Sequence, residues 1–297
     1  METAALPLRH LLLALAVVAV WGTNFVVIRI GLDHLPPLLF AALRFLFACL
    51  PGVFFVRRPR VPFVSMAAYG LLIGAGQFGL LFIALRSQIA PGLASLVIQV
   101  QVFFTIGLAV WLSGERVRSF QWGALALGAT GLLVIAAHTD AATTPLGLGL
   151  VVLAALSWAG GNIVAKRSGV TDMLPFVIWA SLFSAPPLFL ASFALEGWDA
   201  IRAGILYADA TTWAAVAWQT VGNTLFGYTA WGFLLSRHPA ASITPTALLV
   251  PVFGMAASFI WLGEPLPLWK LGAAALVMSG LALGLLYPRW RVRAGRI

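Results

Sequence analysis

The chain alternates between long apolar runs and short polar connections. Ten such runs lie at about residues 11–30, 36–56, 64–85, 91–113, 119–137, 147–165, 173–194, 212–235, 240–262 and 268–287. Each is roughly 18 to 25 residues long, which is enough for a helix to cross a hydrocarbon core about 30 Å thick. The pattern therefore predicts ten transmembrane helices.

Composition supports a membrane protein rather than a soluble one. Hydrophobic residues make up 61% of the chain and charged residues 9%, whereas soluble domains carry about 25% charged residues. Little chain remains outside the apolar runs, so no soluble domain of any size is expected. The first run continues past Trp21 without a small-residue cleavage site, which predicts an uncleaved span instead of a signal peptide. The lone Cys49 excludes an internal disulfide.

The two halves of the chain end with the same sequence motif. A Gly-Glu dipeptide at residues 114–115 is matched by another at 263–264, and in each half glycines follow the Glu at plus eight and plus sixteen. Each half also opens on an apolar segment with a central tryptophan, at Trp21-Gly-Thr-Asn and at Trp158-Ala-Gly-Gly-Asn. Repeats of this size indicate two copies of one structural unit.

An odd number of spans in each copy sets the predicted topology. Ten spans divide into five per copy, so the second copy must enter the membrane from the opposite face. We expect an all-α integral membrane protein whose ten transmembrane helices form two inverted five-helix repeats, residues 1–140 and 141–297, within one membrane domain. The connection at 196–211 is longer than its counterpart at 57–63, and forms either a short outer cap or only a connector.

The positive charge is distributed unevenly between the two sides. The formal net charge is +9, but the basic residues lie at the ends of the apolar runs and do not form the clustered patch that nucleic acid requires. Counted over the predicted connections, 13 Lys and Arg fall on one side and four on the other. The positive-inside rule then predicts that both termini are cytoplasmic. The expected location is the inner (plasma) membrane.

Several of these motifs together resemble a known family. The Trp21-Gly-Thr-Asn opening, the Leu43-Arg44-Phe45 segment and the two Gly-Glu phrases are similar to the EamA-type drug/metabolite transporters, and the resemblance covers essentially the whole chain. Within that family the chain is most similar to the YddG-type amino-acid exporters. The resemblance implies a ten-helix transporter with a central cavity lined by helices 1, 3, 4, 6, 8 and 9.

Polar and aromatic residues inside these inner spans are the candidates for solute binding. Polar groups in a span must be satisfied by protein or water, so they mark a cavity better than apolar residues do. The alternative is that the amides only connect neighbouring helices. Gln99 and Gln101 are about 200° apart on an ideal helix, so both can face one cavity only if the helix is irregular, and we select Gln99. The candidates are Trp21, Asn24, Gln77, Phe78, Phe82, Gln99, Trp158, Asn162, Asn223 and Tyr228.

The charged residues near the spans are assigned structural roles. Arg44 is the one charge well inside a predicted span, and we expect it to brace backbone carbonyls. Glu115 and Glu264 lie at helix ends, where they are expected to organise the turns that follow.

The inventory of reactive residues argues against an enzyme. All four histidines and all nine acidic residues fall in connections or at the ends of spans, so no intramembrane catalytic group, metal site or cofactor site is expected. An aromatic wall with amide donors and acceptors suits a medium-sized amphipathic solute.

We therefore predict a transporter that exports small amphipathic metabolites, including aromatic amino acids, by alternating access and without ion coupling. Alternatives are a carrier of nucleotide sugars, drugs or lipids, or a membrane scaffold that transports nothing. A nucleotide sugar would require phosphate-binding Lys or Arg on the inner helices, and none is present there. The expected partners are a small-molecule substrate and the lipid bilayer, with no nucleic acid, and a monomer is favoured.

Overall fold

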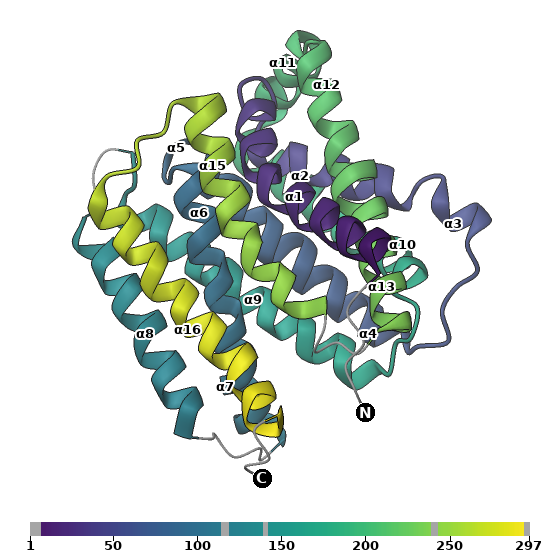
Figure 1. Ribbon diagram of the computed structural model, residues 1–297. Helices are drawn as coiled ribbons and strands as arrows, with labels where there is room; N and C mark the ends of the chain where they lie inside the picture. Colours follow the sequence, from purple (N-terminus) through teal and green to yellow (C-terminus); the bar gives the residue numbers. More distant parts are fainter. Residues whose placement is uncertain (1–6, 114–118, 139–141, 239–242, 294–297) are drawn as a thin grey trace.

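The computed structural model describes residues 7–113, 119–138, 142–238 and 243–293, and within these ranges the chain is helical with no strand (Figure 1). Glu115, which the sequence assigns to a helix end, lies outside the described residues. The first half contains α1 (Leu8–Gly31), α2 (Pro37–Cys49), α3 (Gly52–Phe55), α4 (Phe63–Gly70), the π-helix η1 (Leu71–Gly79), α5 (Leu80–Ser87), α6 (Pro91–Val97), the 3-10 helix η2 (Ile98–Val100), α7 (Gln101–Ser113) and α8 (Ser119–Ala137).

The second half continues the same helical pattern and adds one helix outside the predicted spans. It contains α9 (Pro145–Ser168), α10 (Met173–Ala191), the π-helix η3 (Ser192–Glu196), α11 (Trp198–Tyr207), α12 (Ala210–Ala217), the π-helix η4 (Trp218–Phe226), α13 (Gly227–Arg237), the 3-10 helix η5 (Thr244–Leu249), α15 (Val250–Leu262) and α16 (Leu268–Arg293).

The described helices include seven that are long and apolar enough to cross a membrane. The other three predicted spans are helical too, as the continuous α12–η4–α13 segment and as shorter apolar helices at Thr246–Leu262 and Leu268–Gly284. The chain is therefore a multi-pass helical membrane protein.

The long connection at 196–211 contains the short helix α11, which projects with the start of α12 at one end of the molecule (Figure 1). Ile201 and Gly204 of α11 are buried, and a Cβ at Gly204 would lie 2.6 Å from Cδ of Pro36. The helix therefore packs closely on the turn that precedes α2.

Glu196 joins this end of the molecule to the start of α2. Its carboxylate accepts hydrogen bonds from the backbone N–H groups of Leu38 (2.7 Å) and Leu39 (3.1 Å), and from the hydroxyl of Ser192 (2.5 Å). The first N–H groups of a helix have no partner within the helix, and its dipole favours a negative charge there. A carboxylate from the second half of the chain thus caps a helix of the first half.

Glycines allow two helix pairs to meet at their backbones. A Cβ at Gly22 in α1 would lie 2.6 Å from the carbonyl oxygen of Val250 in α15. A Cβ at Gly280 in α16 would lie 2.7 Å from the carbonyl oxygen of Ala124 in α8, and these two helices run side by side (Figure 1). Small residues are the usual means by which helices approach closely in a membrane.

Two spans contain a π-helical segment near their middle, η1 and η4. Such segments leave backbone groups that ordinary helical hydrogen bonds do not satisfy, and here side chains supply the partners. Ser184 and Ser157 donate to the carbonyls of Gly70 (2.8 Å) and Leu72 (2.7 Å), and Thr224 donates to that of Gln219 (2.9 Å). These segments carry several of the polar residues that face the centre of the molecule.

Candidate functional site: a central cavity backed by a buried arginine

A cavity of about 490 Å³ lies in the centre of the molecule, between α1, η1, the η2 region, α9, η4 and the start of α15. Polar and aromatic side chains share its wall. All the site residues predicted from the sequence except Phe82 line it: Trp21, Asn24, Gln77, Phe78, Gln99, Trp158, Asn162, Asn223 and Tyr228.

Phe82 lies behind the wall of the cavity. Its ring is fully buried and packs edge-on against Phe40 of α2 at 5.0 Å and Phe78 at 6.2 Å between centroids. Leu81, one turn after Gln77, takes the cavity-facing position. Phe82 is one residue further, about 100° around the helix, and this rotation turns it toward α2. Its placement in the cavity is therefore corrected to a supporting position.

Both glutamines of the fourth predicted span reach the cavity. The 3-10 turn η2 lies between α6 and α7, and Gln99 and Gln101 both line the wall. The tighter turn changes the angle between the two side chains, so that both can face one cavity. The sequence alone did not indicate that the helix is irregular here. Oε1 of Gln101 also accepts a hydrogen bond of 3.0 Å from Nδ2 of Asn162.

Aromatic residues that the sequence did not single out complete the wall. Trp231 packs on Trp21 at 5.2 Å between ring centroids, and Tyr228 lies 6.0 Å from the same ring. Trp231 follows Tyr228 by three residues, so the helical face could have identified it. Tyr69 lies in α4 just before the glycine-rich η1, and no sequence signal distinguishes it from a lipid-facing tyrosine.

Arg44 is fully buried behind this wall and is bound by three side chains of η4. Its Nε donates to Oγ1 of Thr224 (3.2 Å), Nη1 to Oε1 of Gln219 (2.9 Å) and Nη2 to Oδ1 of Asn223 (2.9 Å). The guanidinium also lies over the ring of Phe78, 3.6 Å from its centroid. The expectation of backbone carbonyl partners is therefore wrong. Helical carbonyls already accept bonds within their helix, whereas the π-helix brings three side-chain oxygens to one face.

The positive charge of Arg44 has only neutral partners in the described part of the chain. The ion pairs found there join Arg29 to Asp33, His34 to Asp209 and Lys270 to Glu264, and Arg44 takes part in none of them. Burying a cation without a counter-ion is costly unless hydrogen bonds compensate. The hydrogen bonds from Arg44 supply that compensation and leave a net positive charge beside the cavity.

Gln77 is the one cavity residue with a fully enclosed polar atom and no partner in the described structure. Its side chain is 4% exposed, and its Oε1 atom accepts no hydrogen bond from any described group. A buried amide oxygen without a partner costs free energy. Gln77 lines the cavity, but a solute or water can reach this oxygen only after the side chain changes its rotamer.

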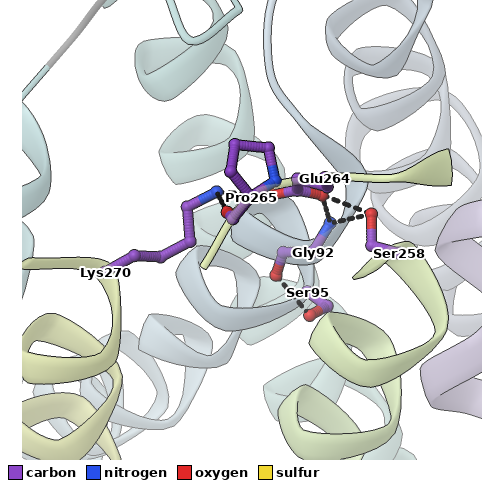
Figure 2. Close-up of polar contacts among 6 residues, drawn as sticks. All are labelled: Gly92, Ser95, Ser258, Glu264, Pro265 and Lys270. Carbon is purple, nitrogen blue, oxygen red and sulfur yellow. Dashed lines mark hydrogen bonds and ion pairs between the residues drawn. The ribbon is translucent and has the colours of Figure 1, made fainter. Parts of the chain in front are cut away.

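A second polar cluster lies away from the cavity, where α6, α15 and α16 meet (Figure 2). The carboxylate of Glu264 accepts hydrogen bonds from the backbone N–H of Gly92 (2.9 Å) and from the hydroxyl of Ser258. Nζ of Lys270 lies 2.8 Å from the other carboxylate oxygen and 2.9 Å from the carbonyl oxygen of Pro265. Glu264 thus organises the turn before α16 and also caps the start of α6.

A larger hollow of about 590 Å³ opens between α2, α3, α10 and α13. Its lining is almost entirely apolar, with Phe47, Ile178 and Phe226 among its residues. Specific binding of a small molecule requires a few convergent polar groups, so the central cavity is the candidate site.

Comparison with known proteins assigns the chain to a family. The model of the EamA-like transporter family matches residues 8–137 and 145–286. The chain belongs to the EamA-like transporter family. The resemblance drawn from the sequence motifs is confirmed, and the EamA membership supports a transport role.

Relatives of this EamA-family chain include proteins named as exporters. It is 41% identical to a probable amino-acid metabolite efflux pump of Salmonella typhimurium, over 96% of this chain and 97% of that protein. It is 40% identical to a protein of the same name in Escherichia coli, over 94% and 95% of the two chains. A probable terminal-alkyne amino-acid exporter of Streptantibioticus cattleyicolor is 28% identical, over 90% of each chain. A solved crystal structure shares the fold, with a TM-score of 0.62 and 19% identity over 95% of this chain and 98% of that one.

Proposed function

We propose that this protein exports amino-acid-like metabolites across the inner membrane, and that the solute passes through the central cavity. The observation that carries the proposal is a central cavity lined by both aromatic rings and amides, in a chain 41% identical to a probable amino-acid metabolite efflux pump. Cavities that combine apolar walls with a few polar groups are typical of small-molecule binding.

The dimensions and chemistry of the cavity favour an amphipathic solute, including an aromatic amino acid. A volume of about 490 Å³ is within the usual range of roughly 300 to 1,000 Å³ for small-molecule sites. Trp21, Trp158 and Trp231 offer flat apolar surfaces for a side chain, while Gln77, Gln99 and Asn162 offer hydrogen bonds. Aromatic rings add edge and face contacts to the free energy of burial.

The proposed transport cycle uses two inverted five-helix repeats, residues 1–140 and 141–297, that together provide ten transmembrane helices. Both termini are cytoplasmic and α11 lies outside. Irregular turns at η2 and η5, each at the start of a helix that approaches the cavity, support bending of these helices during alternating access. Labelling of a cysteine in the Arg202→Cys variant from the external side tests the orientation, and labelling from the cytoplasm alone would contradict it.

Counterflow in proteoliposomes tests the function. Vesicles that contain the purified protein are loaded with one unlabelled amino acid and exposed to the same labelled one, for each of the twenty amino acids in turn. The proposal predicts accumulation of label for a group that includes aromatic amino acids. No counterflow above protein-free vesicles for any of the twenty would contradict the assignment of amino-acid-like solutes.

A further inference from the structure

We propose that the cavity contains a carboxylate-binding subsite formed by the side-chain N–H groups of Asn24 and Asn223 and made electropositive by Arg44 behind them. The inference rests on the proposed function to the extent that a solute must enter the cavity. It adds the part of the solute that is recognised and the groups that recognise it.

The orientation of both amides follows from the chemistry of arginine. A guanidinium can only donate hydrogen bonds, so Gln219 must present its oxygen to Arg44, as it does at 2.9 Å. Its nitrogen is then the group that faces Asn24, where it donates to Oδ1 at 2.6 Å. Asn24 consequently accepts with its oxygen, and its Nδ2 group points elsewhere.

The same argument fixes the second amide. Asn223 accepts from Nη2 of Arg44 with Oδ1 at 2.9 Å, which leaves its Nδ2 group free to donate. Oxygen and nitrogen of an amide are often hard to distinguish, but here the donor-only guanidinium determines which end is which. A chain of hydrogen bonds that begins at one buried cation therefore turns two N–H₂ groups away from Arg44.

Both N–H₂ groups reach the cavity. Asn24 and Asn223 line it, and neither nitrogen donates a hydrogen bond to another group in the described part of the chain. A side-chain nitrogen without a hydrogen-bond partner is either fully enclosed or accessible, and neither of these two is fully enclosed. Both nitrogens are therefore accessible. The two residues are nevertheless only 3% and 5% exposed, so an acceptor that binds them is shielded from bulk water.

The charge of Arg44 selects an anion as that acceptor. The guanidinium is 0% exposed and has no carboxylate partner among the described residues, so solvent screens its field little on the cavity side. A carboxylate in front of the two amides would receive two hydrogen bonds and also provide the missing counter-charge. Phosphate groups usually require direct contacts with Lys or Arg, which are absent from the described lining of the cavity, so a carboxylate fits better.

The subsite gives an amino-acid solute a defined orientation. The carboxylate lies against Asn24 and Asn223, and the side chain extends toward the tryptophans. The amide of Gln77 lines the same cavity, but its oxygen is fully enclosed, so it is not assigned to the ammonium group. The described lining of the cavity contains no acidic residue that could bind the ammonium group.

The test compares an acid with its matching alcohol in the purified wild-type protein. Quenching of tryptophan fluorescence measures binding of 3-phenylpropionate and 3-phenylpropanol, which differ only in the carboxylate. We expect the acid to bind at least about tenfold more tightly, as hydrogen bonds to a charged group imply. Equal affinities, or binding of neither compound, would overturn the subsite. This result does not depend on transport of any amino acid, so failure of the proposed function is seen separately in the counterflow assay.

The variant Asn24→Asp assigns the preference to the amide. Aspartate keeps an oxygen that accepts from Gln219 but places a second oxygen where Nδ2 faces the cavity, with almost no change in shape. The ratio of acid to alcohol affinity should fall by at least about tenfold. Gln88→Glu is the matched control, because it makes the same change of amide to carboxylate at a residue that is not in the cavity lining and bonds to Thr144 and Ser87. An unchanged ratio in Asn24→Asp, or an equal fall in Gln88→Glu, would overturn the role of Asn24.

Discussion

At the scale of single residues, the most consequential group is the buried Arg44. Its side chain holds Gln219, Asn223 and Thr224 of η4 in fixed positions from a different helix. Three bonds from one planar group also require each acceptor to lie at its own angle, which a single ammonium could not match. Arg44 thus connects the packing of α2 to the shape of the cavity wall.

The change Arg44→Lys should therefore destabilise the protein despite the retained charge. A lysine ammonium cannot reach all three acceptors, so buried amide oxygens lose their donor. We expect the free energy of unfolding to fall by about 2 to 3 kcal/mol, measured by thermal or denaturant unfolding in detergent. Arg202→Lys on the exposed face of α11 is the control. A variant at position 44 as stable as the control would contradict the structural role.

Trp158 provides the second prediction at this scale. It lines the cavity one turn before Asn162, so Trp158→Ala should remove contact area for a bulky side chain. Counterflow of aromatic amino acids should fall at least about fivefold relative to small ones, because lost apolar contact is greater for a larger solute. Trp122→Ala on α8 is the control, since Trp122 is 65% exposed on the outer surface of the molecule. Unchanged selectivity at position 158 would exclude this residue from solute contact.

The sequence identified cavity residues by one physical signal, a polar or aromatic side chain where lipid would otherwise be expected. This signal identified Asn24, Gln77 and Asn223, because amides in a span need a polar environment. It could not separate Phe82 from Phe78, since both are apolar and lie four residues apart on nearly the same helical face. This signal could not identify the partners of Arg44 either, because they depend on which face the π-helix presents to it.

At the scale of elements, the positions of the spans were predictable and their irregularities were not. Runs of apolar residues marked most of the described helices to within a few residues, but not α11, which lies between two runs. The π-helical segments η1 and η4 and the 3-10 turn η2 arise from the balance between backbone bonds and side-chain packing. Glycines and prolines in the sequence indicate where such breaks can occur, but not which form they take.

The start of α12 offers a test of capping at a helix outside the cavity. The carboxylate of Asp209 accepts hydrogen bonds from the hydroxyl and the backbone N–H of Thr212, both at 2.7 Å. These two hydrogen bonds lower the pKa of Asp209 below its ordinary value. A lowered folded-state pKa means that the carboxylate contributes stability above its unfolded pKa, and that this stability is lost as pH falls through the folded value.

Asp209→Ala should therefore lower the melting temperature at neutral pH, because the cap is lost. The difference from wild type should shrink as pH falls from about 4, the ordinary pKa of an aspartate, through the lower pKa of the folded carboxylate. Asp209→Asn is the matched control, because its amide can still cap the helix but does not titrate in this range. The measurement is thermal unfolding at several pH values. A difference between wild type and Asp209→Ala that does not depend on pH would contradict the assignment.

At the scale of the whole molecule, the arrangement of charge bears on the source of energy for transport. The lining of the cavity contains no Asp, Glu, His or Lys among its described residues. Proton-driven carriers generally use such a titratable group, which exchanges protons with both sides of the membrane. We therefore expect the solute to move down its own gradient.

This expectation is tested in proteoliposomes with an imposed pH gradient, with and without a protonophore. Net movement of the solute should stop at equal concentrations inside and outside under both conditions. Accumulation against the solute gradient that the protonophore abolishes would show proton coupling. A neutral solute and a zwitterion should be compared, so that a proton carried by the solute itself is recognised.

The central claim, that the solute passes through the cavity, has one direct test. Ala165 lines the cavity in α9, while Leu133 in α8 is 69% exposed on the outer surface. Cysteine is introduced at each position in turn, and counterflow is measured before and after reaction with a bulky membrane-permeant thiol reagent, with the wild type, whose Cys49 is buried, as the reference. The account predicts that the reagent abolishes counterflow in Ala165→Cys and leaves it intact in Leu133→Cys and in the wild type. Full counterflow in the Ala165→Cys protein after complete labelling would contradict it.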